Sequence, residues 1–334
     1  MRKHLFIAVS AVLIMGVLAL FAYRTTRSLS SVPSRTVAYL VDKDVRILES
    51  NARGERQATK FADVFRIFDQ RPDGSMLFGR KLDASRSTDT TFATALWLLR
   101  PNGRAEELVP NYVMEAKFVP GGNDVLYVTD EAELYRWSNG KSKKLQSKVS
   151  DLAVSQDGGA AAYIKLNADW SRGQYSDRAL GLAKLDLLTG KETQLTNTWE
   201  DFGPSFSPDG SSLAFASGRA AGLASVWMMD ADGKNQRQIT NVGQVDYDPD
   251  KTLTAPGSPL LWTPDGRHLV YESDRKIWSL TLDDKKTKLS EAKQIGYGEQ
   301  PVLIDDQTVG ILTAPSSTTT PKITKVRLNG DVVE

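Results

Sequence analysis

A repeated turn between short apolar runs is the feature that most constrains how this chain folds. Its fullest copy lies between Pro204 and Thr240, where the turn Ser207-Pro208-Asp209-Gly210 precedes an apolar strand at 213–216. Another strand is expected at 226–229, and the hairpin turn Asp230-Ala231-Asp232-Gly233 follows it. Proline sets φ at the first corner of such a turn, and glycine accepts a positive φ at its end. The block therefore predicts four strands in one antiparallel meander.

Copies of this block recur along the chain. The second-best copy is Leu260–Lys288, which contains the turn Thr263-Pro264-Asp265-Gly266 and the pair Ile277-Trp278. Including weaker copies, the turn falls at successive intervals of 36 to 56 residues, at Pro72, Pro120, Gln156, Pro208, Pro264 and Ile304. Such periods are typical of propeller blades or solenoid units, and strands in place of helix pairs favour the propeller. The predicted fold class is all-β, a β-propeller of four-stranded antiparallel blades.

The two best copies resemble the repeat of the TolB-like (PD40, WD40-like) β-propeller family. That pattern runs Ser-Pro-Asp-Gly, an apolar strand, Ser-x-Arg, Ile-Trp, Asp-Gly and Leu-Thr. Here Ser217-Gly218-Arg219 and Ser273-Asp274-Arg275 occupy the Ser-x-Arg place. The match is specific in these two blocks only. The resemblance implies a propeller, six as the usual number of blades, and a location outside the cytoplasm.

The number of blades depends on which strand is counted. Residues 36–60 supply strands but no Pro-Asp-Gly turn, so second strands number seven and innermost strands six. Seven blades with an incomplete first blade are favoured, and six are the alternative. The C-terminal Val332-Val333 is expected to complete the first blade, because closing the ring removes exposed strand edges. The propeller domain is predicted to span 36–334.

The N-terminus carries an uncharged apolar segment, Leu5–Tyr23. As a helix it would extend about 28 Å, close to the thickness of a bilayer core. Residues 1–23 are predicted to be an uncleaved transmembrane signal anchor, with a cleaved signal peptide as the alternative. Residues 24–35, rich in Ser, Thr and Arg, are predicted to be a flexible tether. Arg2 and Lys3 precede the span and Arg24 and Arg27 follow it, so charge alone does not set the orientation. The family resemblance decides it: a single-pass protein of a bacterial-type cell membrane, with the propeller on the extracytoplasmic, periplasmic side.

Three tryptophans repeat at one place. Trp97, Trp227 and Trp278 each lie six residues before Gly103, Gly233 and Asp284, respectively. Packing between neighbouring blades is the predicted role, and a row of ligand-stacking rings is the alternative.

Two predicted loops between second and third strands are long. The loop 81–94 contains Phe92, and the loop 167–178 contains an aromatic and arginine set typical of protein interfaces: Trp170, Arg172, Tyr175 and Arg178. These residues are predicted to bind a protein partner. The alternative is that the second loop folds onto its own surface.

Three acids share a place just before the expected innermost strands, Glu115, Asp151 and Glu299, and Glu200 and Asp201 lie near that place. They are predicted to lie around the mouth of the channel, either as a solvated acidic rim or as a cradle for a basic peptide or a cation. In the loop 241–259, Asp246, Asp248 and Asp250 alternate, but Lys251 and Gly257 stand where an EF-hand needs Gly and Glu. No metal is predicted there, and a cation site is the alternative.

The inventory of catalytic groups is poor. The sequence has no cysteine and two histidines, His4 and His268, and it lacks a Gly-x-Ser-x-Gly elbow and a phosphate loop. No catalytic residue and no cofactor are predicted. The formal net charge of +1 argues against a nucleic-acid partner. The favoured function is a non-catalytic, membrane-anchored scaffold or accessory subunit of a membrane or envelope complex. A carboxylate-based hydrolase, or a binder of small ligands or cations in the channel, is the alternative.

Overall fold

The computed structural model describes residues 36–41, 43–49, 55–82, 94–167, 179–219, 225–240, 260–273, 275–283, 292–313 and 322–333. All of them belong to one compact region, Arg35–Glu334. No helix among these residues is long and apolar enough to cross a membrane. The expected anchor and tether, residues 1–35, lie outside the described part of the chain.

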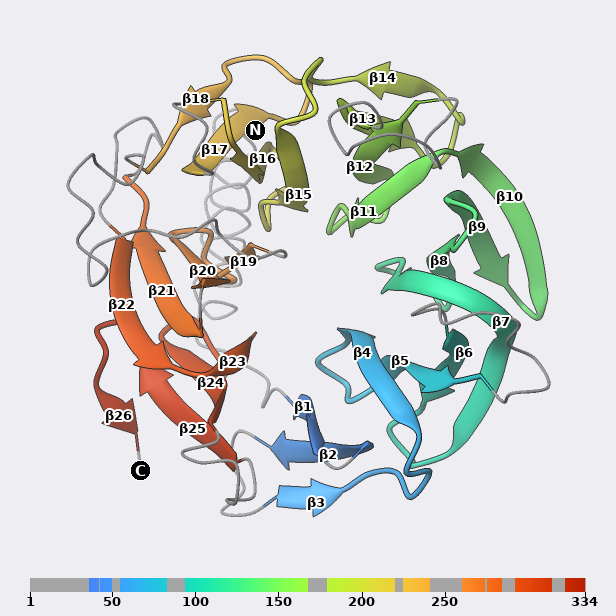
Figure 1. Ribbon diagram of the computed structural model, residues 1–334, viewed down its shortest axis with the longest axis vertical. Helices are drawn as coiled ribbons and strands as arrows, with labels where there is room; N and C mark the ends of the chain where they lie inside the picture. Colours follow the sequence, from blue (N-terminus) through green and yellow to red (C-terminus); the bar gives the residue numbers. More distant parts are fainter. Residues whose placement is uncertain are drawn as a thin grey trace, which may run out of the picture. The chain divides into compact units, whose positions relative to one another are not determined.

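The described residues form strands in antiparallel sheets (Figure 1). In chain order the strands are β1 (Thr36–Val41), β2 (Asp44–Glu49), β3 (Glu55–Gln57), β4 (Val64–Gln70), β5 (Met76–Lys81), β6 (Thr94–Leu99), β7 (Ala105–Phe118), β8 (Val125–Thr129), β9 (Glu133–Ser138), β10 (Lys141–Ser147), β11 (Val149–Val154), β12 (Ala160–Leu166), β13 (Ala179–Asp186), β14 (Glu192–Gln194), β15 (Asp201–Phe206), β16 (Ser212–Ser217), β17 (Ser225–Asp230), β18 (Arg237–Gln238), β19 (Leu261–Trp262), β20 (His268–Ser273), β21 (Lys276–Thr281), β22 (Ala292–Tyr297), β23 (Glu299–Leu303), β24 (Thr308–Thr313), β25 (Lys322–Arg327) and β26 (Val332–Val333).

These strands group into successive meanders, which we call units. The first unit is β1–β3, and the last four units are β11–β14, β15–β18, β19–β22 and β23–β26. The seven-stranded sheet β4–β10 contains the second and third units, which share the long strand β7. The first half of β7 pairs with β6, and its second half pairs with β8 as the innermost strand of the third unit. The all-β class and the four-stranded antiparallel sheets predicted from the sequence are thereby confirmed.

The units follow one another around a central axis (Figure 1). Strand β4 contacts β7, β7 contacts β11, β11 contacts β15, and β15 contacts β19. Strand β20 then contacts β23, and β1 contacts both β23 and β4. Within Arg35–Glu334 the arrangement is therefore propeller-like.

The predicted turns form as local chemistry dictates. In the fifth unit, Gly210 has φ +70° and its N–H donates to the Ser207 carbonyl at 2.8 Å. The Ser207 hydroxyl donates to Asp209 Oδ1 at 2.5 Å, and the Ser212 N–H donates to the Ser207 hydroxyl at 3.0 Å. Thr263 and Asp265 make the equivalent contact at 2.6 Å in the sixth unit. The hydroxyl and the carboxylate therefore fix each turn from within.

The first unit corresponds to the second, third and fourth strands of a complete unit. The Val45 N–H, on β2, donates to Thr59 Oγ1 at 2.9 Å, just as the Leu182 N–H donates to Thr196 Oγ1 at 2.9 Å in the fourth unit. Because Leu182 lies on a third strand, β2 is also a third strand and β1 is a second strand. An innermost strand in the first unit is absent from the described residues.

A side chain caps the open edge of β1. The Ala38 N–H donates to Gln70 Oε1, on β4, at 3.0 Å. Within the described residues, β1 pairs with β2 alone, so the amide of Gln70 supplies one acceptor that an innermost strand would otherwise provide.

The C-terminal strand corrects one expectation. Val332–Val333 does not complete the first unit but pairs with β25, with Val333 opposite Lys325. A tight turn joins the two strands, in which the Gly330 N–H donates to the Arg327 carbonyl at 2.8 Å and Gly330 has φ +89°. Closing the short loop between β25 and β26 costs less conformational entropy than pairing the C-terminal strand with the first unit, which is distant in sequence.

The three repeated tryptophans pack between units, as predicted. Trp227 packs against a buried cluster that contains Leu182 of the fourth unit and Phe215 of its own. Trp278 and Trp97 contact the corresponding clusters between the fifth and sixth and between the first and second units. Each tryptophan lies opposite an aromatic residue on the neighbouring second strand: Phe78, Phe215 or Tyr271.

Apolar clusters join each unit to the next from the first to the seventh. A further small cluster, Ile304 with Leu312 and the half-buried Val302 and Ile323, lies wholly in the seventh unit. Among the described residues, none of these clusters joins the seventh unit to the first.

Strand direction defines two faces. The turns between first and second strands and the hairpins between third and fourth strands lie on one face, which we call the turn face. The strand ends that flank the connections between second and third strands, and those that flank the connections between units, lie on the opposite face, the loop face.

Candidate functional site

Bulges interrupt the innermost strands near the loop face. Register breaks occur between Ser150 and Ala153 on β11, between Phe202 and Ser205 on β15, and between Glu299 and Val302 on β23. Each bulge contains one residue with positive φ, namely Asp151 (+52°), Gly203 (+61°) or Gln300 (+50°). Bulges re-aim backbone and side-chain groups.

Acids on three innermost strands, β4, β7 and β11, accept backbone N–H groups from the following unit. The Leu152 N–H donates to Glu115 Oε2 at 2.9 Å, and the Gly203 N–H donates to Asp151 Oδ2 at 3.2 Å. Asp69, on β4, accepts the Phe118 N–H at 2.8 Å. Carboxylates thus connect the second, third, fourth and fifth units.

A cavity of about 480 Å³, which we call the channel pocket, opens beside these acids. It is lined by residues of β4, β7, β8, β11, β12 and β15 and by the connection after β8. Its charged lining residues are Arg66, Glu115, Lys117, Asp130 and Asp151, and its apolar lining residues include Phe68, Val128 and Leu152. Most of these lie near the loop-face ends of their strands.

The two cations of the channel pocket make few contacts within the described residues. Arg66 Nη1 donates to the Met114 carbonyl at 3.0 Å, and the guanidinium carbon lies 5.1 Å from the Phe65 ring centroid and 5.8 Å from that of Phe68. Lys117 Nζ is 3.5 Å from the Phe68 carbonyl oxygen. Burial lowers the pKa of Arg66, while the charge of Glu115 opposes that shift.

Burial raises the pKa of Glu115 to about 7, with the nearby Asp151 charge adding to the effect and Lys117 and Arg66 opposing it. Burial also raises the pKa of Asp151 and of Asp69, and Lys117 offsets part of both shifts. The raised pKa favours the protonated form of Glu115, in which the carboxyl group can donate as well as accept a hydrogen bond.

The other predicted rim acids have separate roles. Asp201 is fully buried and pairs with Arg219 of its own unit, with 2.5 Å between Arg219 Nη2 and Asp201 Oδ2. Glu200 accepts from Thr198 Oγ1 at 3.2 Å, and Glu299 lies 3.2 Å from Arg275 Nε. Of the five acids, Glu115 and Asp151 are the two that line the channel pocket.

The remaining predicted site residues lie outside the described part of the chain: Phe92, Trp170, Arg172, Tyr175, Arg178, Asp246, Asp248 and Asp250. Within the described part, no group of three or more His, Cys, Asp and Glu is placed to hold a metal ion.

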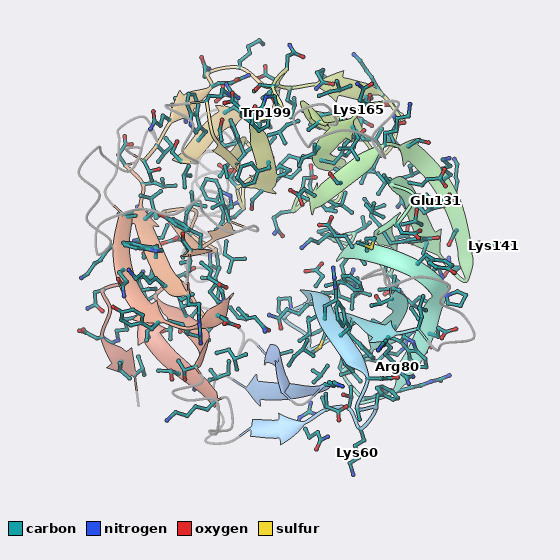
Figure 2. The ribbon with its side chains drawn as sticks, in the orientation of Figure 1. Lys60, Arg80, Glu131, Lys141, Lys165 and Trp199 are labelled. Atoms are coloured by element: carbon teal, nitrogen blue, oxygen red, sulfur yellow. The ribbon has the colours of Figure 1, made fainter. Side chains whose placement is uncertain are left out.

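Four exposed apolar side chains lie at loop-face strand ends of different units, which sequence reasoning missed. The large exposed hydrophobic residues among those described are Phe65, Leu180, Leu188, Trp199, Tyr297 and Val332. Phe65 and Leu180 are each the second residue of a strand that begins at the loop face, Trp199 precedes β15, and Tyr297 ends β22. Leu188 and Val332 belong to the turn face. Trp199 is labelled in Figure 2. The position of Trp199 in the connection between two units is the sequence feature that could have predicted its exposure.

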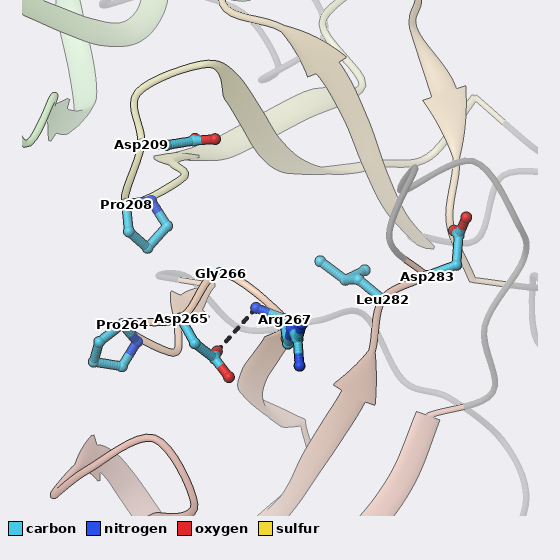
Figure 3. A pocket seen from close by; sticks show the side chains of 8 residues that line it. All are labelled: Pro208, Asp209, Pro264, Asp265, Gly266, Arg267, Leu282 and Asp283. Carbon is cyan, nitrogen blue, oxygen red and sulfur yellow. Dashed lines mark hydrogen bonds between the residues drawn. The ribbon is translucent and has the colours of Figure 1, made fainter. Parts of the chain in front are cut away.

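A second cavity, of about 450 Å³, lies on the turn face between the turns at Pro208 and Pro264 (Figure 3). Two of its lining acids, Asp209 and Asp265, accept hydrogen bonds within their own turns. Asp209 accepts from Ser207 and Ser211, and Asp265 accepts from Thr263 and the Arg267 N–H. We assign no site to this cavity.

No protein-family model matches the chain. A segment of 123 residues, 36% of the chain, is 28% identical to the uncharacterized peptidase YuxL of Bacillus subtilis strain 168 and covers 17% of that relative.

Solved structures agree with the fold. An oligogalacturonate lyase in complex with manganese superposes with a TM-score of 0.61 at 15% identity, over 90% of this chain and 84% of that one. A putative TolB from Agrobacterium tumefaciens gives 0.52 at 16% identity, over 77% of this chain and 89% of that one. These likenesses support the propeller-like fold. The similar structures include both an enzyme and a TolB protein. The expectation that this protein is not an enzyme therefore gains no support from them.

Proposed function

We propose that the protein is a non-catalytic binding scaffold whose loop face docks a protein partner. The observation that carries this proposal is that Phe65, Leu180, Trp199 and Tyr297 are exposed at loop-face strand ends of different units, with Trp199 46% and Leu180 44% exposed. Exposed apolar side chains that share a face are typical of protein interfaces. The strand ends that flank the two long loops predicted to bind a partner, 81–94 and 167–178, also lie at this face.

The use of the acids supports binding over catalysis. Glu115 and Asp151, the pair that a carboxylate-based hydrolase would need in the channel pocket, both accept inter-unit N–H groups. Asp201 is committed to Arg219. Hydrolysis by Glu115 and Asp151 remains the second candidate, favoured by the position of both residues in one cavity.

We further propose that Leu5–Tyr23 anchors the protein in the cell membrane, with the propeller on the extracytoplasmic side, where it serves a larger membrane or envelope complex. The uncharged length of the segment and the TolB-like resemblance support this. We expect the protein to stay in the membrane fraction after a carbonate wash. Release of a shortened chain beginning near Tyr23 would contradict the anchor.

Affinity purification through a C-terminal tag, after gentle detergent extraction, tests the docking face. Leu180→Ala combined with Trp199→Ala is expected to reduce recovery of the partner. The matched control is Leu188→Ala, because Leu188 is 92% exposed but lies on the turn face. Equal loss with both variants, or no loss with either, would argue against the loop face as the docking surface.

A further inference from the structure

The channel pocket contains two cations, Arg66 and Lys117, that make no close ion pair among the described residues, although neighbouring carboxylates act on both at longer range. Elsewhere in the described residues arginines pair closely with acids, as when Arg80 Nη2 lies 2.7 Å from Asp63 and Arg136 Nη2 lies 2.6 Å from Asp124. No such ion pair within the described residues involves Arg66 or Lys117. Each makes one hydrogen bond, to a backbone carbonyl, and that of Lys117 is long at 3.5 Å.

The neighbouring acids, however, are held by hydrogen bonds of their own. Glu115, Asp151 and Asp69 each accept a backbone N–H from the following unit. These contacts hold the carboxylates against the backbone of the next unit, so they remain within range of Lys117 without closing an ion pair. The guanidinium of Arg66 and the ammonium of Lys117 therefore keep further N–H donors at the cavity beyond the one hydrogen bond that each makes.

We propose that the channel pocket binds the carboxylate group of a small ligand, with Arg66 and Lys117 as its two anchors. A guanidinium presents a planar set of donors that matches a carboxylate, and an ammonium adds a second point charge. A cavity of about 480 Å³ lies in the size range of small-molecule sites. Phe68, Val128 and Leu152 give the rest of the ligand an apolar wall, so the expected class is a carboxylic acid with an apolar body.

The charge balance of the pocket sets how binding depends on pH. Arg66 and Asp69 on β4, Glu115 and Lys117 on β7, Asp130 after β8 and Asp151 on β11 are the groups concerned. When Glu115 is protonated it donates a hydrogen bond to a carboxylate, and when ionised it repels one. Since the pKa of Glu115 is raised to about 7, affinity for the carboxylate should fall as pH rises through that value.

Two sources of a carboxylate fit this chemistry, a free small acid and the C-terminus of a peptide. The probes are therefore phenylacetate with phenylacetamide as its uncharged match, and the tripeptide Gly-Gly-Phe with its C-terminal amide. Binding to the full-length protein in detergent is measured by isothermal titration. We expect at least one acid to bind and its amide not to bind. Phenylacetate alone would indicate a small acid, and Gly-Gly-Phe alone a peptide C-terminus.

Variants assign the anchors. Arg66→Gln and Lys117→Gln are each expected to weaken binding of the acid by about tenfold or more. Lys141→Gln, an exposed lysine on the outer strand β10, should leave it unchanged. If Arg66→Gln fails to fold, the fall in wild-type affinity between about pH 6 and about pH 8 decides. Binding of the amides as tightly as the acids, no binding of either acid, or undiminished binding by both variants would overturn the proposal. Leu180→Ala with Trp199→Ala should keep acid binding, which separates this site from the docking face.

Discussion

The Arg219 guanidinium donates to both carboxylate oxygens of Asp201, from Nε to Oδ1 at 2.8 Å and from Nη2 to Oδ2 at 2.5 Å. The same guanidinium lies 4.9 Å from the Trp227 ring centroid and 5.5 Å from that of Phe215. One arginine of the Ser-x-Arg element therefore ties the start of an innermost strand to the aromatic pair of its own unit. Arg80 and Asp63 make a similar bidentate contact in the second unit, at 2.7 Å for both bonds.

Removing Arg219 should therefore be costly. Arg219→Ala leaves a fully buried carboxylate unpaired, so we expect a loss of about 3 to 5 kcal/mol in the free energy of unfolding. Urea denaturation of the full-length protein measures it. Arg80→Ala is the matched control, because Asp63 keeps 33% of its side chain exposed and water can solvate it. A loss no larger than that of the control would show that the pair contributes little.

Trp227→Ala should destabilise the protein by about 3 kcal/mol or more, because it opens a cavity between the fourth and fifth units. Trp199→Ala removes the same side-chain type from an exposed position, so we expect a smaller change in the denaturation midpoint. The two variants are compared in one thermal denaturation series. Similar midpoints for both would rule out an inter-unit role for Trp227.

Stability should depend on pH through Glu115. The folded chain holds the Glu115 proton more tightly than the unfolded chain, because the pKa rises from 4.5 to about 7 on folding. This contribution is complete below the unfolded value and is lost as pH rises through about 7. In Glu115→Gln we expect the decrease in unfolding free energy between about pH 5 and about pH 8 to become shallower. Glu131→Gln, at an exposed position, should leave the slope unchanged, and an unchanged slope in Glu115→Gln would refute the assignment.

The predicted docking loop 167–178 has its own test. Replacing Trp170 and Tyr175 together by Ala should weaken co-purification of the partner, because a single aromatic anchor contributes about 2 kcal/mol or more to binding. The melting temperature should stay nearly constant. Undiminished partner recovery would move the docking surface elsewhere, and unfolding of the variant would indicate a structural loop.

The units were predictable from sequence because the turns between their strands depend on local contacts. The hydroxyl, carboxylate and glycine of Ser207–Gly210 satisfy one another within a few residues, so the turn needs no distant partner. The repeated tryptophan was also predictable, because a fixed distance to the next turn fixes its place on the third strand.

The candidate site was harder to predict because its contacts are distant in sequence. Glu115 accepts from Leu152, 37 residues away, and Asp151 from Gly203, 52 residues away. The sequence could group the acids by position but not say which would face a cavity. Arg66 and Lys117 were missed altogether. Charged residues within innermost strands were the available signal, since apolar neighbours surround both.

The joint between the seventh and first units has a consequence for folding cooperativity. Each other pair of successive units shares a buried apolar cluster, so ordering one unit favours the next. Within the described residues, the last joint has contacts between β1 and β23 but no shared cluster. Like a repeat array with nearest-neighbour coupling, the ring should open first at its weakest joint and lose structure from there. A partner that bound to the first and seventh units together would therefore couple the two ends of the ring and make unfolding of all the units more cooperative.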